Sequence, residues 1–536
     1  MKKGTLYAIL IVLAVVLGVG GWVLLSGSQE AAPNQAPAPA AKPEPETKVQ
    51  HPAAPAEPPK PVIPEEKVDI VLVGSEMEGM YLARAAADEG LKVVIIDPAE
   101  GVGGQLLQAE MLFLDETKDD AGRSLVQGRV KELFDGFKAG SIRKTSEYEK
   151  YFADKLAKGI PIESGVKIDK VETAPGTNGK EKVVSVVYTG KDGKPKKLTA
   201  SHWVENTDHA ALASKLKTVR LPGLESVYGL PTIEYMASGY MMKFKNIDWN
   251  RFVTHFNSLS DRDRANLYGV AYVNDSFAIA LTDMVRKYTA SDELVFLRGL
   301  NAVYQRDGEV LINALLVYDV DPSKPESVKV ALERVRKELP MIRDHFRKHI
   351  VGWEKAEING YPNHLYVREY NHYETDHVLQ VSDALGGKMF WDNVSIAGYP
   401  LDLQGTKSVK WGIEMGRPDK YGMPLRSFLL KSYDNVIMAG KNVGASAVAY
   451  GSARIQPNTA LAAESIGVLI KQLGGAKTLA QVDEADMKQL HATLASKYNI
   501  RLTGVTGANK ISGWSEAEIA KLNEGSISYP AYVRTR

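Results

Sequence analysis

The pattern of hydrophobic and polar residues predicts a strand, a helix and a second strand at the start of the folded part of the chain. Residues 70–73 are a run of branched apolar residues, which is typical of a strand buried in a parallel sheet. A glycine turn follows, and small apolar residues at helical spacing continue from about Glu76 to Asp88. Residues 93–96 form a second apolar run that ends in Asp97. This order predicts a βαβ unit.

The pattern changes after Ile160, where short runs alternate between apolar and polar residues. Glycine-rich turns join these runs, which lie at 166–171, 183–188 and 197–204. Alternation of this kind, bounded by turn residues, predicts three strands of an antiparallel meander.

The middle of the chain, about 220–385, has a mixed pattern that includes a long amphipathic helix from Ser327 to about Ile350, interrupted by Pro340. Further on, a second strand and glycine turn at 434–446 lead into a helix that begins near Pro457. We therefore predict an α/β fold with a Rossmann-like parallel sheet, a three-stranded β-meander and a mixed α+β domain.

The N-terminus has the pattern of a membrane segment. Residues 5–25 carry no charge and follow Lys2 and Lys3. As a helix they would span about 31 Å, which matches the hydrocarbon core of a bilayer. We expect a retained single-pass transmembrane anchor with the folded body outside the cytoplasm. The small residues at 26–28 leave a cleaved signal peptide as the alternative.

Composition removes several classes of function. The formal net charge is +1, so we expect no nucleic-acid partner. The chain has no cysteine, which excludes disulfides, thiolate metal sites and a redox dithiol. His345 and His349 lie one helical turn apart but lack the glutamate of an H-E-x-x-H motif, so we expect no metal site.

The turn after the first strand reads Gly74-Ser75-Glu76-Met77-Glu78-Gly79. In a G-x-G-x-x-G turn the first glycine permits the tight bend, the last permits close helix packing, and the helix N-terminus favours a diphosphate. Here the middle glycine is replaced by Glu76, whose side chain could block the diphosphate. Asp97, at the end of the second strand, is placed to accept hydrogen bonds from a ribose.

From Val68 to about Leu473 the chain resembles the FAD-dependent oxidoreductases of the FAD_oxidored type, within the glutathione-reductase-like two-dinucleotide-binding superfamily. The segments that carry the resemblance are VLVGSEMEG, GVGGQ, HWVENTDHAALA, YPLDLQ, YGMPLRS and NVIMAGKNVGASAVAYGSARIQP. The resemblance implies FAD as the cofactor. It implies that FAD is bound by Gly74, Ser75, Met77, Gly79, Asp97, Pro98, Gly103, Gly104, Gln105, Val166, Thr207, Asp208, Gly440, Asn442, Pro457, Asn458 and Thr459.

The same resemblance suggests a division of the chain. We expect an anchor or signal at 1–28, a Pro/Ala-rich linker at 29–66, an FAD-binding domain at 67–218 and 391–475, a substrate or cap domain at 219–390, and a helical tail at 476–536.

Two departures from the family bear on catalysis. Many relatives carry two histidines where this chain has Ala447 and Tyr450, so Tyr450 is the local candidate for a proton donor. Arg454 is retained and is either an anion clamp for the substrate or part of a structural ion pair.

Glu76, if FAD binds, must point to solvent, to the ribose or to a cation, and we expect it to lie outward or on the ribose.

These observations favour a membrane-anchored, extracytoplasmic FAD-dependent oxidoreductase. It would transfer a hydride or electron pair between a small-molecule substrate and the flavin, and pass electrons to an acceptor that the sequence does not identify. The alternative is a non-catalytic FAD-fold surface protein that serves as a binding or assembly module, which Glu76 and the missing histidines favour.

Overall fold

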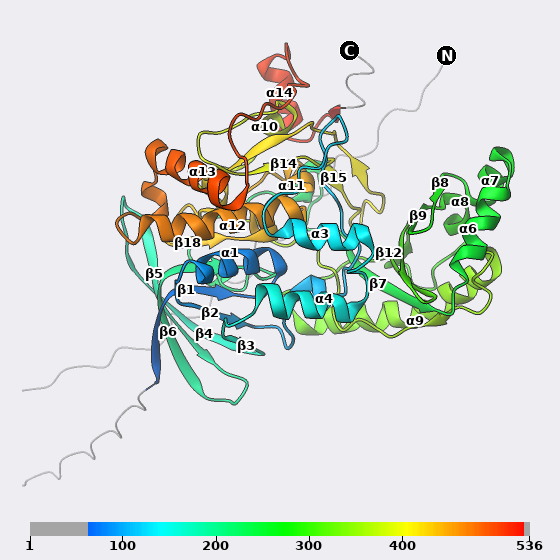
Figure 1. Ribbon diagram of the computed structural model, residues 1–536, viewed down its shortest axis with the longest axis horizontal. Coiled ribbons are helices and arrows are strands. Elements are labelled where there is room, and N and C mark those ends of the chain that lie inside the picture. The colour runs from blue at the N-terminus through cyan, green and yellow to red at the C-terminus, as the bar shows by residue number, and fades with distance from the viewer. Residues whose placement is uncertain (1–62, 530–536) are drawn as a thin grey trace, which may run out of the picture. The chain divides into compact units, whose positions relative to one another are not determined.

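The computed structural model describes residues 63–529 (Figure 1). The predicted membrane anchor at 1–28 and nearly all of the predicted linker lie outside the described residues. Within 63–529, every helix is too short or too polar to span a membrane.

A seven-stranded sheet forms the centre of the FAD-binding part predicted from the sequence. β1 (Glu65–Val73) lies between β2 (Val93–Asp97) and β6 (Pro195–Glu205) and is parallel to both. β3 (Ile162–Ser164) extends the sheet beyond β2, and β18 (Val436–Met438) pairs with β6, both in parallel. The βαβ prediction is therefore confirmed, although β1 begins inside the segment that we assigned to the linker.

The sheet is apolar on both faces because it separates two cores. On β1, Ile70 and Leu72 face one core, and Val71 and Val73 face the other. This explains the continuous apolar run, since alternation between apolar and polar residues appears only where one face of a strand meets water.

The predicted meander is present and is continuous with the central sheet. β4 (Lys167–Pro175) pairs with β5 (Glu181–Thr189), and β5 pairs with β6, all antiparallel. β6 pairs with β5 near its start, over residues 195–199, and with β1 from Lys197 to its end. The meander thus extends the main sheet instead of forming a separate layer.

Helices cover one face of this sheet. Two of them, α1 (Met77–Asp88) and α12 (Gln456–Leu473), lie side by side and pack closely against each other (Figure 1). A methyl group added to Gly467 on α12 would lie 2.7 Å from the carbonyl oxygen of Leu82 on α1. The absence of a side chain at Gly467 therefore allows the two backbones to approach. Nearby, α3 (Val130–Ala139) and α4 (Thr145–Tyr151) complete the layer.

A second sheet of seven strands belongs to the middle of the chain and has the order β13-β7-β12-β11-β9-β8, with β10 paired to β12. Its bounds are β7 (Ser238–Lys245), β8 (Ala271–Val273), β9 (Phe277–Ala280), β10 (Val295–Leu297), β11 (Leu300–Arg306), β12 (Glu309–Val317) and β13 (Glu357–Ile358). In Figure 1 this region projects to one side, with α6 (Trp249–Ser258), α7 (Asp261–Tyr268) and α8 (Thr282–Arg286) at its end.

The long helix α9 (Pro325–His349) is continuous, so the predicted interruption at Pro340 is wrong. Proline removes one backbone hydrogen bond and costs about 3 kcal/mol inside a helix. Val335 and Leu339 before it, and Ile342 and Phe346 after it, are fully buried in the second core. Burial of these side chains on both sides of Pro340 offsets that cost.

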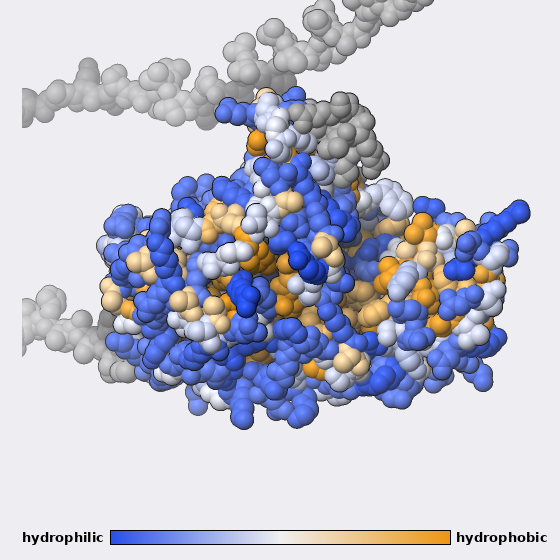
Figure 2. Space-filling model, turned by 45° about the horizontal axis from the view of Figure 1, so that its top comes forward, coloured by the Kyte–Doolittle hydropathy of each residue, from blue (hydrophilic) through white to orange (hydrophobic). Residues whose placement is uncertain are grey.

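After α12 the described chain forms α13 (Glu484–Tyr498) and α14 (Glu516–Asn523), in the region predicted as a helical tail. The surface seen in Figure 2 is mostly hydrophilic, and hydrophobic side chains show mainly in its hollowed middle.

Candidate functional site

A cavity of about 740 Å³ lies where β1, β2 and β6 end at their carboxyl ends. In open parallel sheets this is the edge at which nucleotides bind. Predicted residues form much of the wall, and the start of α9 forms the opposite side. The predicted residues in the lining are Gly74, Ser75, Asp97, Pro98, Gly104, Thr207 and Asp208.

Asp97 holds the glycine turn in place. Gly74 has a φ of +94°, which a residue with a side chain rarely adopts, and a methyl group there would lie 2.3 Å from the carbonyl oxygen of Asn206. The next residue, Ser75, donates from its backbone N–H and its hydroxyl to Asp97 Oδ2, at 2.8 and 2.5 Å. Gly103 in turn donates its N–H to Ser75 Oγ at 2.8 Å. The glycine turn and the Gly103-Gly104 segment are thus fixed to the end of β2.

Asn206, which follows β6, is the residue that requires Gly79 to be small. Its Oδ1 accepts the Gly79 N–H at 3.0 Å, and its Nδ2 donates to the carbonyl oxygen of Glu76 at 2.8 Å. A methyl group on Gly79 would lie 2.2 Å from Asn206 Cγ. We expected Gly79 to be limited by its packing on the first strand, so the contact with Asn206 corrects that expectation.

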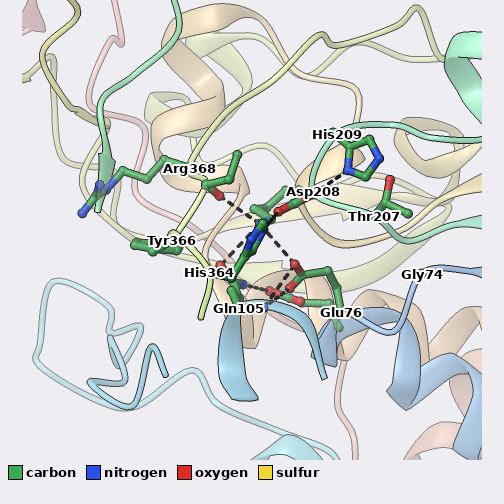
Figure 3. Close-up of polar contacts among 12 residues, drawn as sticks. Gly74, Glu76, Gln105, Thr207, Asp208, His209, His364, Tyr366 and Arg368 are labelled. Carbon is green, nitrogen blue, oxygen red and sulfur yellow. Dashed lines mark hydrogen bonds and ion pairs between the residues drawn. The ribbon is translucent and has the colours of Figure 1, made fainter. Parts of the chain in front are cut away.

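Glu76 does not lie outward, and this corrects the sequence-based expectation. Its side chain is buried, and its carboxylate accepts the N–H of Gln105 with both oxygens, at 3.1 and 3.2 Å (Figure 3). A methyl group on Gly104 would lie 2.4 Å from Glu76 Cδ. Burial raises the pKa of Glu76 to about 7, in spite of Lys441, whose Nζ lies 3.6 Å from Oε1. Glu76 therefore points toward a cation, Lys441, and not toward solvent.

Lys441 was missed in the sequence, although it lies between the predicted residues Gly440 and Asn442. It is buried and donates to the carbonyl oxygen of Val367 at 2.9 Å and to Gln105 Oε1 at 3.4 Å. Glu78 completes the group, because Gln105 Nε2 donates to its Oε1 at 3.0 Å. Burial raises the pKa of Glu78 as well, and its other oxygen has no hydrogen-bond donor within residues 63–529.

Asp208 joins two histidines beside this group (Figure 3). Its Oδ1 lies 2.7 Å from His209 Nδ1, and its Oδ2 lies 2.9 Å from His364 Nε2. Burial opposes the charges, but the mutual hydrogen bonds lower the pKa of Asp208 and raise the pKa of His209 and of His364. His364 had no recognisable signal in the sequence, because it belongs to an irregular segment outside the glycine turns that were assigned to the cofactor.

The other predicted cofactor residues fall in two groups. Val166 donates its N–H to the carbonyl oxygen of Asp97 at 3.1 Å, and Asn442 Nδ2 donates to the carbonyl oxygen of Thr207 at 2.9 Å. These contacts bring the meander and the C-terminal segment to the cavity wall. Like Val166 and Asn442, the remaining residues are buried without lining this cavity: Met77, Gly79, Gly103, Gln105, Gly440, Pro457, Asn458 and Thr459.

A second cavity of about 270 Å³ contains Arg454 and lies at the residue that precedes α12, Ile455. Tyr450, by contrast, is not in its lining. The Tyr450 hydroxyl is buried and donates to the carbonyl oxygen of Arg368 at 2.9 Å, and burial raises its pKa well above the usual value. Its role as a proton donor stays a prediction that this position does not favour.

A family model described as FAD dependent oxidoreductase matches residues 69–494, which is most of the chain. The chain belongs to this family. FAD is therefore its cofactor, and an oxidoreductase replaces the alternative of a non-catalytic module. Placement in the glutathione-reductase-like superfamily stays a prediction.

Solved structures that resemble this FAD-dependent oxidoreductase do so at low identity. A geranylgeranyl bacteriochlorophyll reductase-like protein from Thermoplasma acidophilum is 11% identical over 88% of this chain and 96% of its own, with a TM-score of 0.32. The p-nitrophenol 4-monooxygenase PnpA from Pseudomonas putida DLL-E4 is 11% identical over 85% and 93%, with a TM-score of 0.36. Among curated proteins, none matches the chain significantly.

The residues of the larger cavity fit the adenosine and diphosphate of FAD. Gly74 and Gly104 line the cavity with bare backbone, at positions where a methyl group would collide with Asn206 and with Glu76, and the N–H of Gln105 already binds an anion, the Glu76 carboxylate. That carboxylate shows that this turn stabilises negative charge. A diphosphate bound here would have to share the space with the Glu76 side chain. Lys441 and His364 supply nearby positive charge.

Proposed function

We propose that this enzyme transfers a hydride or an electron pair between a small organic substrate and FAD, with the adenosine in the 740 Å³ cavity and the flavin directed to the 270 Å³ cavity. One observation supports this above all. His364 lines the first cavity, and Tyr366 and Arg368, two and four residues later, line the second (Figure 3). A single segment therefore connects the two cavities, as a cofactor that extends from one to the other requires.

When bound, FAD supplies the two-electron redox chemistry. The residues of the smaller cavity supply charge and proton transfer. Although burial opposes it, the neighbouring Tyr366 and Asp402 raise the pKa of Arg454, so this guanidinium stays cationic at the N-terminal end of α12. Positive charge at this place favours a flavin that has gained electrons.

Asp115 is the group that can exchange a proton with the substrate. Burial, together with the neighbouring Asp402, raises the pKa of Asp115 toward the range in which a carboxyl group acts as an acid or base. Oxidation of an alcohol or amine also releases a proton, which Asp115 can accept, while bound FAD would supply the two-electron chemistry. In the reverse direction Asp115 can return the proton.

The proposal includes the location of the enzyme. The uncharged segment 5–25, preceded by Lys2 and Lys3, supports a single-pass anchor with the catalytic body outside the cytoplasm. Because the chain has no cysteine, electrons must leave to a diffusible acceptor, a quinone or a carrier protein instead of an internal dithiol. Protease added to intact cells tests the orientation, since cleavage within 29–66 is expected without lysis.

The test of function begins with the full-length protein purified in the presence of FAD. We expect a yellow protein with a Kd for FAD of micromolar or below, about −8 kcal/mol. Under anaerobic conditions, a panel of small alcohols, amines and hydroxy acids should include donors that bleach the bound flavin. A colourless protein whose melting temperature does not change with excess FAD would refute the proposal.

A further inference from the structure

The smaller cavity has an excess of positive charge. Four arginines and three carboxylates are among its lining residues, which are Asp115, Arg298, Arg368, Asp402, Glu414, Arg417 and Arg454 together with neutral side chains. Two of the arginines have carboxylate partners: Arg417 Nη2 lies 2.9 Å from Glu414, and Arg454 Nη2 lies 3.6 Å from Asp402.

Arg298 and Arg368 have no such partner, since no carboxylate of residues 63–529 lies within 4.0 Å of either guanidinium. Arg368 is 2% exposed and uses its Nη atoms on the carbonyl oxygen of Ala237 and on Asn313 Oδ1, at 2.8 and 3.2 Å. Burial, aided by Arg298 and Arg454, lowers the pKa of Arg368 to about 9. A buried guanidinium without a counter-ion is costly.

Both arginines converge on Asn313 of β12. Arg298 Nη2 donates to the Asn313 carbonyl oxygen at 3.3 Å, and its Nε, like that of Arg454, is buried without an acceptor among the described residues. A structural arginine usually has its donors satisfied. Here two Nε donors remain unused beside a cavity large enough for a small molecule.

We propose that this cavity binds the substrate as a small organic carboxylate, with Arg298 and Arg368 as the binding residues and Arg454 beside them. The proposal rests on the proposed function, in which the same cavity receives the flavin. A planar guanidinium binds a carboxylate through two parallel hydrogen bonds. Because the lining has one arginine more than it has carboxylates, the charge matches a monoanion better than a phosphate dianion.

The experiment measures binding, so it does not depend on turnover. The full-length FAD-loaded protein is titrated with propionate, and with propionamide as a neutral control of nearly the same shape. Thermal unfolding and the visible absorbance of the flavin are followed. We expect propionate to raise the melting temperature and shift the absorbance, and propionamide to do neither.

The key variant is Arg298→Gln, because Arg298 is half-buried, lies between β10 and β11, and makes one weak hydrogen bond. It should weaken propionate binding at least tenfold. Arg417→Gln is the matched control, since Arg417 lines the same cavity but is exposed and neutralised by Glu414, and it should change binding less than about threefold. Arg298→Lys keeps the charge but not the planar fork and should restore part of the affinity.

Three outcomes would overturn the proposal: equal binding of propionate and propionamide, equal losses in the Arg298 and Arg417 variants, or tighter binding of inorganic phosphate than of propionate. The proposed function fails separately. If the protein takes up no FAD but propionate still stabilises the FAD-free form through Arg298, the carboxylate site stands alone. If donors bleach the flavin while propionate does not bind, only the carboxylate proposal falls.

Discussion

The charge on Glu76 should control the affinity for FAD, and Glu76→Gln should strengthen binding above neutral pH. The glutamine is isosteric, and its side-chain oxygen can still accept the N–H of Gln105. What it removes is the negative charge beside the turn at which we propose that the diphosphate binds. With a pKa of about 7, Glu76 is neutral below that pH and ionised above it.

The magnitude follows from Coulomb's law. Two unit charges 4 Å apart repel by about 1 kcal/mol in bulk water and by about 4 kcal/mol in a partly buried site. Lys441, 3.6 Å from Glu76, offsets part of this. We therefore expect Glu76→Gln to bind FAD at least tenfold more tightly than the natural protein at about pH 8, or about 1.4 kcal/mol, and equally at about pH 6.

The sign of the pH dependence follows from the same pKa. A protonated Glu76 favours an anionic ligand, so FAD binding is coupled to proton uptake, and the affinity of the natural protein should fall as pH rises through about 7. Although burial opposes it, Asp208 raises the pKa of His209 and of His364, and these groups also lose protons as pH rises. The ratio of the two dissociation constants, variant against natural protein, cancels the histidine contribution and isolates Glu76.

Isothermal titration calorimetry at the two pH values gives this ratio, and buffers of different ionisation enthalpy give the number of protons taken up. Glu100→Gln is the control, because Glu100 lines the same cavity but is exposed to solvent, and it should change the affinity less than about twofold. A ratio that stays near one at both pH values would refute the assignment of Glu76 to the diphosphate site.

Three further predictions concern single contacts. Gly79→Ala should weaken FAD binding at least tenfold, because its methyl group would overlap Asn206. Isothermal titration calorimetry should show that Asn206→Gly, combined with Gly79→Ala, restores most of the lost affinity. Tyr450→Phe removes the hydrogen bond to the Arg368 carbonyl oxygen and should lower the free energy of unfolding by about 1 kcal/mol, while the rate of flavin reduction by a substrate changes less than about twofold. An unchanged stability with a large fall in that rate would instead make Tyr450 a proton donor. Burial raises the pKa of Asp115, so propionate binding should weaken as pH rises and Asp115 ionises. In the propionate titration, Asp115→Asn should bind propionate more tightly and depend less on pH. Identical pH profiles of the variant and the natural protein would contradict this.

The secondary structure could be predicted where a segment is long and its surroundings uniform. The first βαβ unit followed from a strand buried on both faces and a helix with small residues toward α12. The meander followed from alternation. The predicted interruption at Pro340 was wrong because it rested on the low helix propensity of proline and did not include the burial of its neighbours Leu339 and Ile342. No local pattern could show that β6 pairs with both β1 and β5, since register depends on segments far apart in sequence.

The candidate site was predictable where a residue belongs to a turn with a known physical task. Gly74 and Asp97 were found in this way, and both take part in the wall of the larger cavity. Asn206 could have been found by the same rule, because it directly follows a strand of the parallel sheet. His364 and Arg298 could not, since they lie in irregular segments that only the fold brings to the cavities.

The charges around the glycine turn explain how a carboxylate can occupy the place of the middle glycine. When all three are ionised, Glu76, Glu78 and Asp208 supply three negative charges, and Lys441, His209 and His364 supply three positive charges when both histidines are protonated. The group is therefore balanced before FAD arrives. A dianionic diphosphate disturbs that balance, and charges on buried groups such as Glu76 and Glu78 are screened less than charges in bulk water. Protons must enter with the cofactor, and Glu76 and Glu78, whose pKa values burial has already raised, are the groups that accept them most readily. The glutamate that breaks the glycine pattern then acts as a partner of the diphosphate instead of its competitor, provided that it binds protonated.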